Sequence, residues 1–370
     1  MLHHYICRIA VNLMPKLNRV SMLPLWARVG GFENLELLPE EEWSELCLEF
    51  GVHPQYADRK GAIQRAMGEA SLMERYGISL LSYDEYNYPE QLLECPDAPL
   101  VLYYKGTIFP ERNILAVVGT RSASRNCKEI INQIIGNISN CVEPPIILSG
   151  LAHGIDICAQ RAAIDNNLPT YAVVAHGLGM IYPAANREIA NQIVMQKRGA
   201  IFSEYPSNHQ PQKHLFLERN RIIAGMANWL LVGESGLKGG SMVTAKIAFS
   251  YGREIMAIPG SPLDPYAQGC NQLIKHNMAA LVENGNDVIE NIGLEQKIGK
   301  IQDRRVKQIE LTIDEQLIID TLNRQREALN INEISRITRI ATDRLSLILL
   351  NLEMNSLIYA LPGENYRICK

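Results

Sequence analysis

Seven short runs rich in Val, Ile and Leu recur between residues 113 and 283, and helix-like stretches separate most of them. The runs are NILAVVG, PPIILSG, PTYAVVAHG, GAIFSEY, NWLLVGE, EIMAIPG and AALVE. Strands that are apolar throughout are buried on both faces, and the intervening helices supply the crossovers that parallel strands require. The alternation therefore predicts an α/β fold, a Rossmann-like doubly wound parallel sheet over about residues 111–293.

The segments that flank this predicted sheet have other patterns. Residues 1–76 carry apolar residues at helical spacing, which predicts an N-terminal helical (SAM-like) domain. Pro39 followed by three glutamates marks one helix start, because acidic groups favour the amino end of a helix. Residues 77–110 read as a connector with edge strands, and residues 294–307 as a polar linker. Three helical runs and a hairpin in residues 308–370 predict a C-terminal winged helix.

Composition limits the kinds of partner and compartment. The net charge is −4, so positive charge for a nucleic-acid partner has to be local. Eight cysteines occur without a CxxC spacing, which argues against a metal site and favours a reduced, cytoplasmic protein. Charged residues interrupt the apolar patches of the first 20 residues, so we expect neither a signal peptide nor membrane insertion.

Three loops should lie at the carboxyl ends of parallel strands, where open sheets bind ligands. In VVGTRSASRN, Gly119 allows a tight turn, Arg121 is a fixed cation, and Ser122 and Ser124 can cap the next helix. Because free N–H groups at a helix start bind anions, we predict a phosphate site here. The simpler interpretation is a strand-to-helix turn with capping serines.

The other two loops are more ambiguous. LSGLAHGID contains His153 and Asp156, but we favour Asp156 as the start of a helix over acid–base catalysis. In GESGLKGGSMVTA, Gly240 and Ser241 lie where a phosphate can be cradled, although a glycine-rich packing turn explains them equally well. A fragmentary GLG, with Tyr182 in place of the last glycine, argues against NAD, and we expect no cofactor.

The stretch KHLFLERNRIIAG concentrates cations around one aromatic residue. Lys213, Arg219 and Arg221 can neutralise phosphates, and Phe216 can stack on a base, as single-stranded nucleic acid requires. The alternative is that Phe216 belongs to the core and that RNR is a salt-bridge cluster at a helix start. The pattern alone leaves both interpretations open.

No spacing of serines, histidines or cysteines predicts a nucleophile and its base, so we predict no catalytic residue and no enzyme. A nucleotide-processing enzyme, similar to a nucleoside-monophosphate hydrolase, is the alternative. It would need Glu234, Asp156 or Glu204 as a working carboxylate. A structural partner protein that uses its terminal domains is a third possibility.

Several motifs in order over residues 115–275 resemble the DNA-processing protein A (DprA/Smf) family. They are VVGTRSAS, LSGLAHGID, IYPAANRE, SEYP, FLERNRIIAG, GGSMVTAKIAFSYGREIMAIPG and QGCNQLI. The resemblance implies a cytoplasmic homodimer that binds and protects incoming single-stranded DNA and helps load the RecA recombinase during natural transformation. The DNA contacts that the resemblance implies are Arg121, Lys213, Phe216, Arg219 and Arg221. From the two candidate phosphate loops we add Gly119, Ser122, Gly240 and Ser241 as expected DNA contacts. The implied dimer contacts are Leu273, Ile274 and Met278.

This sequence departs from the family pattern at a few positions. His153 stands where the family usually has arginine, Gln160 stands where it has histidine, and residues 175–180 also differ. Residues 308–370 hold seven Lys and Arg against nine Asp and Glu, and Arg344 is the only cation in ATDRLSLILLNLEM. Since duplex DNA needs a basic surface, we expect this domain to have a structural or protein-contact role.

Overall fold

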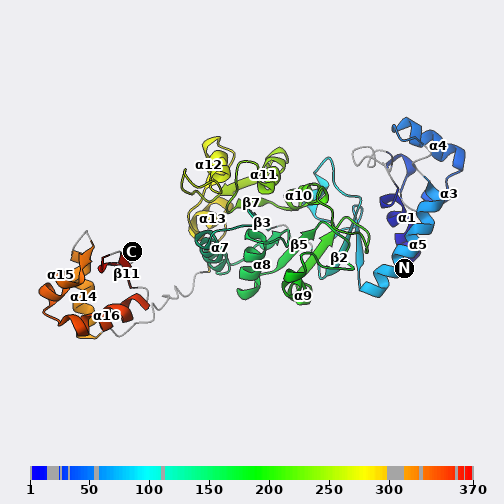
Figure 1. The fold of residues 1–370 in the computed structure, drawn as a ribbon. Helices are drawn as coiled ribbons and strands as arrows, with labels where there is room; N and C mark the ends of the chain where they lie inside the picture. Colours follow the sequence, from blue (N-terminus) through cyan, green and yellow to red (C-terminus); the bar gives the residue numbers. More distant parts are fainter. Residues whose placement is uncertain are drawn as a thin grey trace. The chain divides into compact units, whose positions relative to one another are not determined.

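The computed structural model describes residues 2–14, 25, 27–31, 34–53, 58–109, 113–297, 312–324, 328–354, 357–361 and 363–368. The chain forms two compact units, Met1–Lys297 and Ile298–Lys370 (Figure 1). Each unit buries apolar side chains of its own. They are therefore described separately.

A nine-stranded sheet forms the centre of the first unit, in the order β1-β2-β6-β5-β4-β3-β7-β8-β9. The strands are β1 Ser79–Ser82, β2 Val101–Gly106, β3 Ile114–Val118, β4 Ile146–Ser149, β5 Thr170–Val174, β6 Gly199–Ser203, β7 Trp229–Val232, β8 Glu254–Ala257 and β9 Ala280–Leu281. The pairs β1–β2 and β2–β6 are antiparallel, and the pairs from β6 to β9 are parallel. All seven strands predicted between residues 113 and 283 are confirmed.

Helices cover both faces of this sheet (Figure 1). On one face lie α7 Arg125–Ile138, α8 Ile155–Asp165, α9 Arg187–Met195 and α13 Gly285–Ile292, with the short 3-10 helix η2 Ala184–Asn186 before α9. On the other lie α6 Glu90–Leu93, α10 Leu215–Met226, α11 Gly240–Ser250 and α12 Gln268–Lys275. Strand β3 shows the alternation, because Leu115 packs with α7 and α8 while Ala116 packs with α10 and α11. Burial on both faces explains why these strands are apolar throughout.

The strand order creates a crevice at one edge of the sheet. From β3 the chain builds β4, β5 and β6 on one side, and it then returns to place β7 on the other side of β3. The loops that leave the carboxyl ends of β3 and β7 therefore run in opposite directions. Such a switch point opens the crevice where doubly wound sheets bind ligands.

The N-terminal helices pack against the β1–β2 side of the same unit. They are α1 Leu2–Asn12, α3 Asn34–Leu37, α4 Glu40–Glu49 and α5 Arg59–Tyr76, and α4 begins at Glu40, directly after Pro39, as predicted. Arg8 forms an ion pair of 2.7 Å with Asp84. The Glu69 carboxylate accepts hydrogen bonds from the backbone N–H and the hydroxyl of Ser207, at 2.6 and 2.5 Å. These contacts tie α1 and α5 to the sheet region.

The second unit contains three helices and a three-stranded sheet. The helices are α14 Ile313–Arg324, α15 Ile331–Thr338 and α16 Thr342–Met354, and the strands β10 Leu329–Asn330, β11 Ile358–Leu361 and β12 Asn365–Ile368 pair in the order β10-β12-β11. Fully buried Ile318, Ile334, Leu345 and Leu349 form its core. Most of the linker predicted at residues 294–307 lies outside the described residues, which end at 297 and resume at 312.

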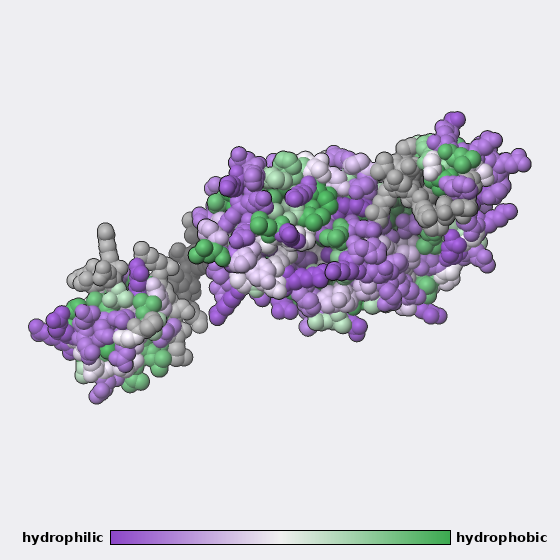
Figure 2. Space-filling view, turned by 45° about the horizontal axis from the view of Figure 1, so that its top comes forward, coloured by the Kyte–Doolittle hydropathy of each residue, from purple (hydrophilic) through white to green (hydrophobic). Residues whose placement is uncertain are grey.

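Hydrophilic side chains cover most of the surface seen in Figure 2, and apolar side chains lie in separate patches. Within the described ranges, no helix has the length and apolar character needed to cross a membrane.

Candidate functional site

A cleft of about 820 Å³ lies at the carboxyl ends of β3 and β7. The loop after β3 contributes Gly119 and Arg121, and the loop after β7 contributes Ser235 and Lys238. The start of α8 and the first turns of α10 and α11 complete the wall. The cleft therefore occupies the switch-point crevice, and it brings together residues of the three carboxyl-end loops and of the stretch KHLFLERNRIIAG.

Positive charge is concentrated in this cleft. Its charged lining residues are Arg121, Lys213, Arg219, Lys238 and Asp156, which gives four cations against one carboxylate. The side chains of Arg121, Lys213 and Lys238 are exposed to solvent. The protein has a net charge of −4, yet its surface is positive at this cleft. Such a local concentration of positive charge is what an acidic protein needs in order to bind nucleic acid.

Two aromatic rings and one guanidinium lie in contact at the cleft. The Arg121 guanidinium carbon lies 5.1 Å from the centre of the Phe216 ring, and the Tyr182 ring centre lies 6.0 Å from it on a tilted plane. Phe216 is half-buried and Tyr182 is 46% exposed, so neither ring belongs wholly to the core. Tyr182 was not predicted as a site residue, because nothing in the local sequence indicates that it lies beside Phe216.

A buried histidine holds the loop that carries Tyr182. The Nε2 atom of His176 accepts a hydrogen bond from the backbone N–H of Tyr182 at 3.1 Å, so Nδ1 carries the proton and donates to the Gly177 carbonyl at 2.9 Å. Burial lowers the pKa of His176, which favours this neutral ring. The histidine therefore has a positioning role.

Arg219 lies beneath the cleft, and its side chain is only 4% exposed. Its guanidinium donates to the carbonyl of Gly150 at 2.8 Å and to that of Val173. A Cβ atom on Gly150 would lie 2.4 Å from the guanidinium, so only glycine fits at that position. Burial lowers the pKa of Arg219 to about 10, and nearby Asp156 opposes that change, so the group stays charged at neutral pH.

Arg221 is also internal, with 5% exposure. It forms an ion pair of 2.5 Å with the buried carboxylate of Glu204, and it donates to the Asp97 carbonyl. Both arginines of RNR therefore donate from their terminal guanidinium nitrogens to groups inside the protein. The expectation that Arg219 and Arg221 contact DNA directly needs correction, since desolvated and internally bonded guanidinium groups are not presented to a ligand.

The start of α7 is closed by the protein itself. The Ser124 hydroxyl caps the helix by accepting from the Cys127 N–H at 3.0 Å. The Glu234 carboxylate accepts from the Ser124 N–H at 2.8 Å and from its hydroxyl at 2.5 Å. A carboxylate of the protein itself thus occupies the place where we predicted a phosphate.

Two other residues of the loop after β3 were also predicted to contact DNA. Ser122 is exposed but does not line the cleft. A Cβ atom on Gly119 would lie 2.5 Å from the Ile155 side chain, so glycine at this position allows the loop to pack against α8.

The start of α11 is open to the cleft. Its N-cap residue, Gly239, makes no side-chain capping hydrogen bond. A Cβ on Gly240 would meet no atom within 4 Å, so this backbone borders open space. The Ser241 hydroxyl donates to the Ser235 hydroxyl at 2.7 Å and holds the loop after β7 against the helix. Uncapped N–H groups at a helix start form an anion site.

None of the carboxylates considered for catalysis stands exposed in the cleft. Asp156 is buried, accepts from the Gly150 N–H at 3.2 Å, and has its pKa raised by that burial despite the opposing charge of Arg219. Glu204 is paired with Arg221, and Glu234 is bonded to Ser124. His153 is exposed outside the cleft lining. Among the residues described, no group of three or more His, Cys, Asp or Glu side chains is arranged to hold a metal ion.

The three residues expected at a dimer contact differ in accessibility. Leu273 is 1% exposed and belongs to the core under α12, so that expectation is corrected for this side chain. Ile274 and Met278 are half-buried and pack against the same core. Leu281, on the edge strand β9, is 48% exposed.

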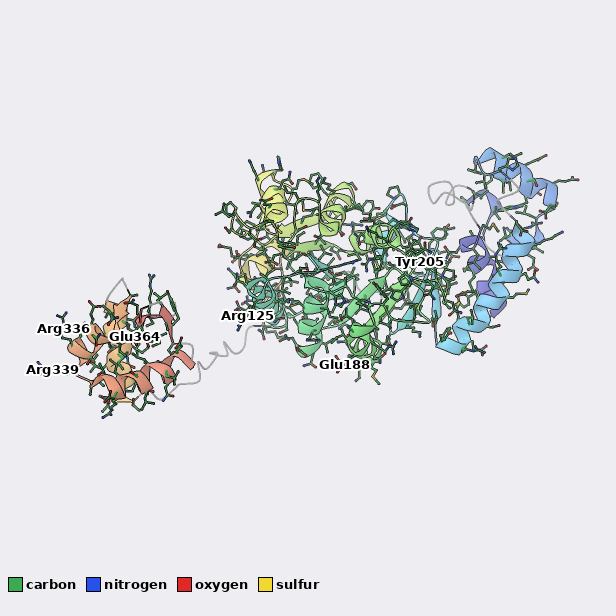
Figure 3. All side chains as sticks on the ribbon, in the orientation of Figure 1. Arg125, Glu188, Tyr205, Arg336, Arg339 and Glu364 are labelled. Atoms are coloured by element: carbon green, nitrogen blue, oxygen red, sulfur yellow. The ribbon has the colours of Figure 1, made fainter. Side chains whose placement is uncertain are left out.

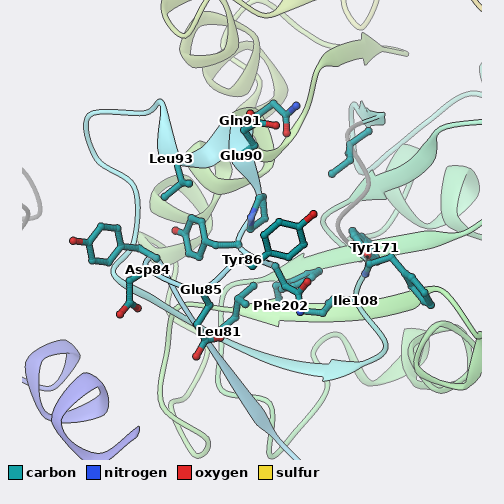
Figure 4. Close-up of a pocket in the computed structure, with 16 residues that line it drawn as sticks. Leu81, Asp84, Glu85, Tyr86, Glu90, Gln91, Leu93, Ile108, Tyr171 and Phe202 are labelled. Atoms are coloured by element: carbon teal, nitrogen blue, oxygen red, sulfur yellow. Dashed lines mark hydrogen bonds between the residues drawn. The ribbon is translucent and has the colours of Figure 1, made fainter. Parts of the chain in front are cut away.

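A second hollow, of about 370 Å³, lies between residues 81–93 and the strands β5 and β6 (Figure 4). Tyr171 and Phe202 form part of its aromatic floor, and Asp84, Glu85 and Glu90 lie at its rim. None of the site residues predicted from the sequence lines this hollow.

Comparisons with known proteins agree on one family. The family model for DNA recombination-mediator protein A matches residues 79–293. The DNA processing protein DprA of Streptococcus pneumoniae is 40% identical over 206 residues, which cover 55% of this chain and 70% of that protein.

Two solved structures are also similar. The X-ray structure of DNA processing protein A from Streptococcus pneumoniae aligns with a TM-score of 0.63 at 30% identity, covering 80% of this chain and 98% of that one. DNA processing protein A from Helicobacter pylori, solved to explain its single-stranded DNA binding mode, aligns with a TM-score of 0.52 at 27% identity. That alignment covers 58% of this chain and 95% of the other.

Proposed function

This chain belongs to the DNA recombination-mediator protein A family, and on that premise we propose that it binds single-stranded DNA in the cleft at the carboxyl ends of β3 and β7. The observation that carries the proposal is the local excess of cations beside an accessible aromatic pair. Cations neutralise phosphates, and rings stack on unpaired bases, which together are the recurring features of single-strand binding sites.

The exposed cations and the two aromatic rings of the cleft each have a role in this proposal. Lys213 and Lys238 contact phosphates, because both are exposed. Arg121 and Phe216 form a platform on which a base stacks, since the guanidinium already lies over the ring. Tyr182 widens that platform.

The open start of α11 is the second phosphate site of the proposal. Gly240 leaves room for a phosphate to approach the backbone, and the bond between Ser241 and Ser235 fixes the loop around it. Gly119, Arg219 and Arg221 act indirectly, because their packing and internal bonds position the exposed groups. Ser122 is kept as a peripheral contact at the exposed end of the loop after β3.

We propose that the protein acts as a mediator and has no catalytic activity of its own. The three carboxylates that a nucleotide-processing enzyme would need are buried or bonded within the protein, which supports this view. Incubation with a panel of nucleoside monophosphates should yield no product. Turnover of any of them would favour the enzyme instead.

The wider role follows from the family and is also a proposal. We expect the chain to protect incoming single-stranded DNA in the cytoplasm and to help load the RecA recombinase during natural transformation. We further expect a homodimer through the β9 edge of the sheet. Ile274, Met278 and Leu281 remain accessible there, whereas Leu273 would support the edge from within.

The terminal regions complete the proposed organisation. We propose that residues 1–76 are a SAM-like helical domain, residues 77–110 a connector, residues 111–293 the DNA-binding domain and residues 308–370 a winged helix. The element order and separate core of α14 to β12 support the last of these. Arg344 on α16 pairs with Asp314, which favours a structural or protein-contact role over duplex binding.

A fluorescence-anisotropy titration tests the central proposal. Wild-type protein should bind single-stranded oligo-dT more tightly than a duplex, with an affinity that falls steeply as salt rises. The Arg121→Ala/Lys213→Ala variant should lose most of this affinity without loss of fold. Equal binding by that variant, or no binding of oligo-dT by the wild type, would overturn the proposal.

A further inference from the structure

A third depression, of about 520 Å³, lies between α7 and α8. Lys128 and Asn132 of α7 form one wall. The other wall is one face of α8 at helical spacing, formed by Gly154, Ile157, Cys158, Arg161, Ala162 and Asp165. We refer to this depression as the α7–α8 groove.

Gly154 joins this groove to the cleft. It has a φ of 81°, and a Cβ there would lie 2.1 Å from the Thr120 carbonyl oxygen and 2.7 Å from the Cα of Arg121. The Ile155 N–H also donates to the Thr120 carbonyl at 3.2 Å. Since Gly154 lines the groove while Thr120 and Arg121 line the cleft, the two depressions share a wall. A nucleic-acid strand that passes over Arg121 therefore reaches the α7–α8 groove directly.

Cations continue from the cleft along this route. Arg121, Arg125 and Lys128 follow one another within eight residues, at the loop after β3 and the first turn of α7. Arg125 projects into solvent, with 91% of its side chain exposed, and pairs with Glu129 at 2.9 Å (Figure 3). Lys128 and Arg161 are exposed on opposite walls of the groove. Neither of these two forms an ion pair with another residue in the described part of the chain.

The thiol of Cys158 shows how closely the two walls approach. Its sulfur lies 3.6 Å from the Lys128 carbonyl oxygen and 3.5 Å from the Asn132 Oδ1 atom. Burial raises the pKa of this thiol, while the charges of Lys128 and Arg161 both lower it. Lys128 and Arg161 both influence the Cys158 thiol, so the two cations lie around the same part of the groove.

We infer that a single strand of nucleic acid held in the cleft continues into the α7–α8 groove, where Lys128 and Arg161 contact its phosphates. This inference rests on the proposed function, and it extends the binding surface beyond the cleft. A polyanion is the ligand that the charge favours, because its phosphates would be neutralised in sequence by Arg121, Lys128 and Arg161. Asp165 lines the groove at the far end of α8, and its negative charge would repel a phosphate, so we expect the binding path to end there.

The dimensions of the groove fit one strand. The 11 residues of α8 span about 16 Å, which leaves room for a few nucleotides beyond the cleft. The sulfur of Cys158 on α8 lies 3.6 Å from the Lys128 carbonyl oxygen and 3.5 Å from the Asn132 Oδ1 atom of α7, so the two helices touch and the groove is a depression along their surface on which a strand can lie. Longer single strands should therefore bind more tightly than those that fill only the cleft.

Salt-dependent anisotropy with the full chain tests this extension. Short and long oligo-dT would be titrated against wild type, Lys128→Ala/Arg161→Ala and a charge-matched control, Lys60→Ala/Lys197→Ala. Each lost phosphate contact lowers the slope of log K against log salt by about 0.7 on a single strand. The groove variant should lose about 1.4 from the slope for the long oligonucleotide only. The control variant should match the wild type.

Alkylation of Cys158 gives an independent readout of occupancy. Cys158 is half-buried, whereas the other described cysteines are buried, so among these a neutral reagent such as iodoacetamide should label Cys158 first, as peptide mass spectrometry would report site by site. The long oligonucleotide should slow this labelling in wild type, and the short one should leave it unchanged. In the Lys128→Ala/Arg161→Ala variant the protection should disappear.

The outcomes separate this inference from the function on which it rests. If wild type binds short oligo-dT, but the groove variant keeps the wild-type slope for the long one, the extension is wrong and the cleft proposal stands. Unprotected Cys158 in the long complex would also overturn the extension. If wild type binds neither oligonucleotide, the proposed function itself fails.

Discussion

Lys213 and Arg221 lie eight residues apart in one cationic stretch, yet the fold uses them in opposite ways. Lys213 precedes α10 and is exposed in the cleft, while Arg221 lies within that helix, 5% exposed and paired with Glu204. The terminal nitrogens of the buried guanidinium already donate to Asp97 and Glu204, whereas the exposed ammonium of Lys213 is available to a ligand. Charge in a sequence therefore becomes a binding site only where the fold leaves it in water.

The largest expected effect is on stability, from Arg221→Ala. The substitution removes the guanidinium that forms the 2.5 Å ion pair with the buried Glu204 carboxylate, so we expect the free energy of unfolding to fall by about 3–5 kcal/mol. Lys213→Ala, the matched surface change, should stay within about 0.5 kcal/mol of wild type. Urea denaturation followed by tryptophan fluorescence measures this, because all three tryptophans lie in residues 1–297. Equal stability of the two variants would contradict the distinction between a structural Arg221 and a surface Lys213.

Two glycines of the cleft differ in the same way, because Gly119 is packed against a neighbouring side chain and Gly240 faces open space. Gly119→Ala should destabilise the protein by about 1–3 kcal/mol, because its Cβ would overlap Ile155. Gly240→Ala should unfold like the wild type, since open space surrounds its Cβ, but it should weaken oligo-dT binding by obstructing the start of α11. The two measurements are urea unfolding and anisotropy. A Gly240→Ala variant that binds normally would exclude that helix start as a phosphate site.

Phe216→Ala tests whether the aromatic ring in the cleft stacks on a base. Loss of one stacked base should cost about 1–3 kcal/mol of binding, or about five- to 150-fold in Kd for oligo-dT. Met195→Ala is the control, because Met195 is an exposed apolar side chain on α9 outside the cleft lining. If both variants bind like the wild type, Phe216 serves packing alone.

The smallest effect concerns pH and His176. Its folded-state pKa is lowered by burial from the ordinary 6.5, so below that pH the unfolded chain takes up a proton that the folded chain does not. Its contribution to stability is complete above pH 6.5 and is lost as the pH falls from there toward the folded pKa. Urea unfolding at several pH values should show this loss, and His176→Gln should reduce it. An unchanged pH profile in the variant would assign the loss to other groups.

Local pattern was sufficient for the elements of the fold. Each of the seven predicted strands has an apolar run, and in β3 to β6 every residue is buried, which is the environment that such runs require. The start of α4 followed from Pro39 and the glutamates after it. These signals lie within a few residues of the structure they specify.

The composition of the candidate site was only partly predictable. Arg121, Lys213 and Phe216 do line one cleft, but Tyr182 was missed and Arg219 and Arg221 proved internal. Glu234 closes the start of α7 from 110 residues away in the chain. No local signal reports such a partner, because the contact exists only after β7 has paired with β3.

The sequence by itself determined the doubly wound sheet, the carboxyl-end loops and the residue types that meet there, because apolar periodicity and turn residues act over short distances. Only the tertiary structure decided which cations remain in water, which helix start stays open and which ring joins Phe216. Those choices depend on desolvation and on contacts between distant segments, and both are set when the elements pack together.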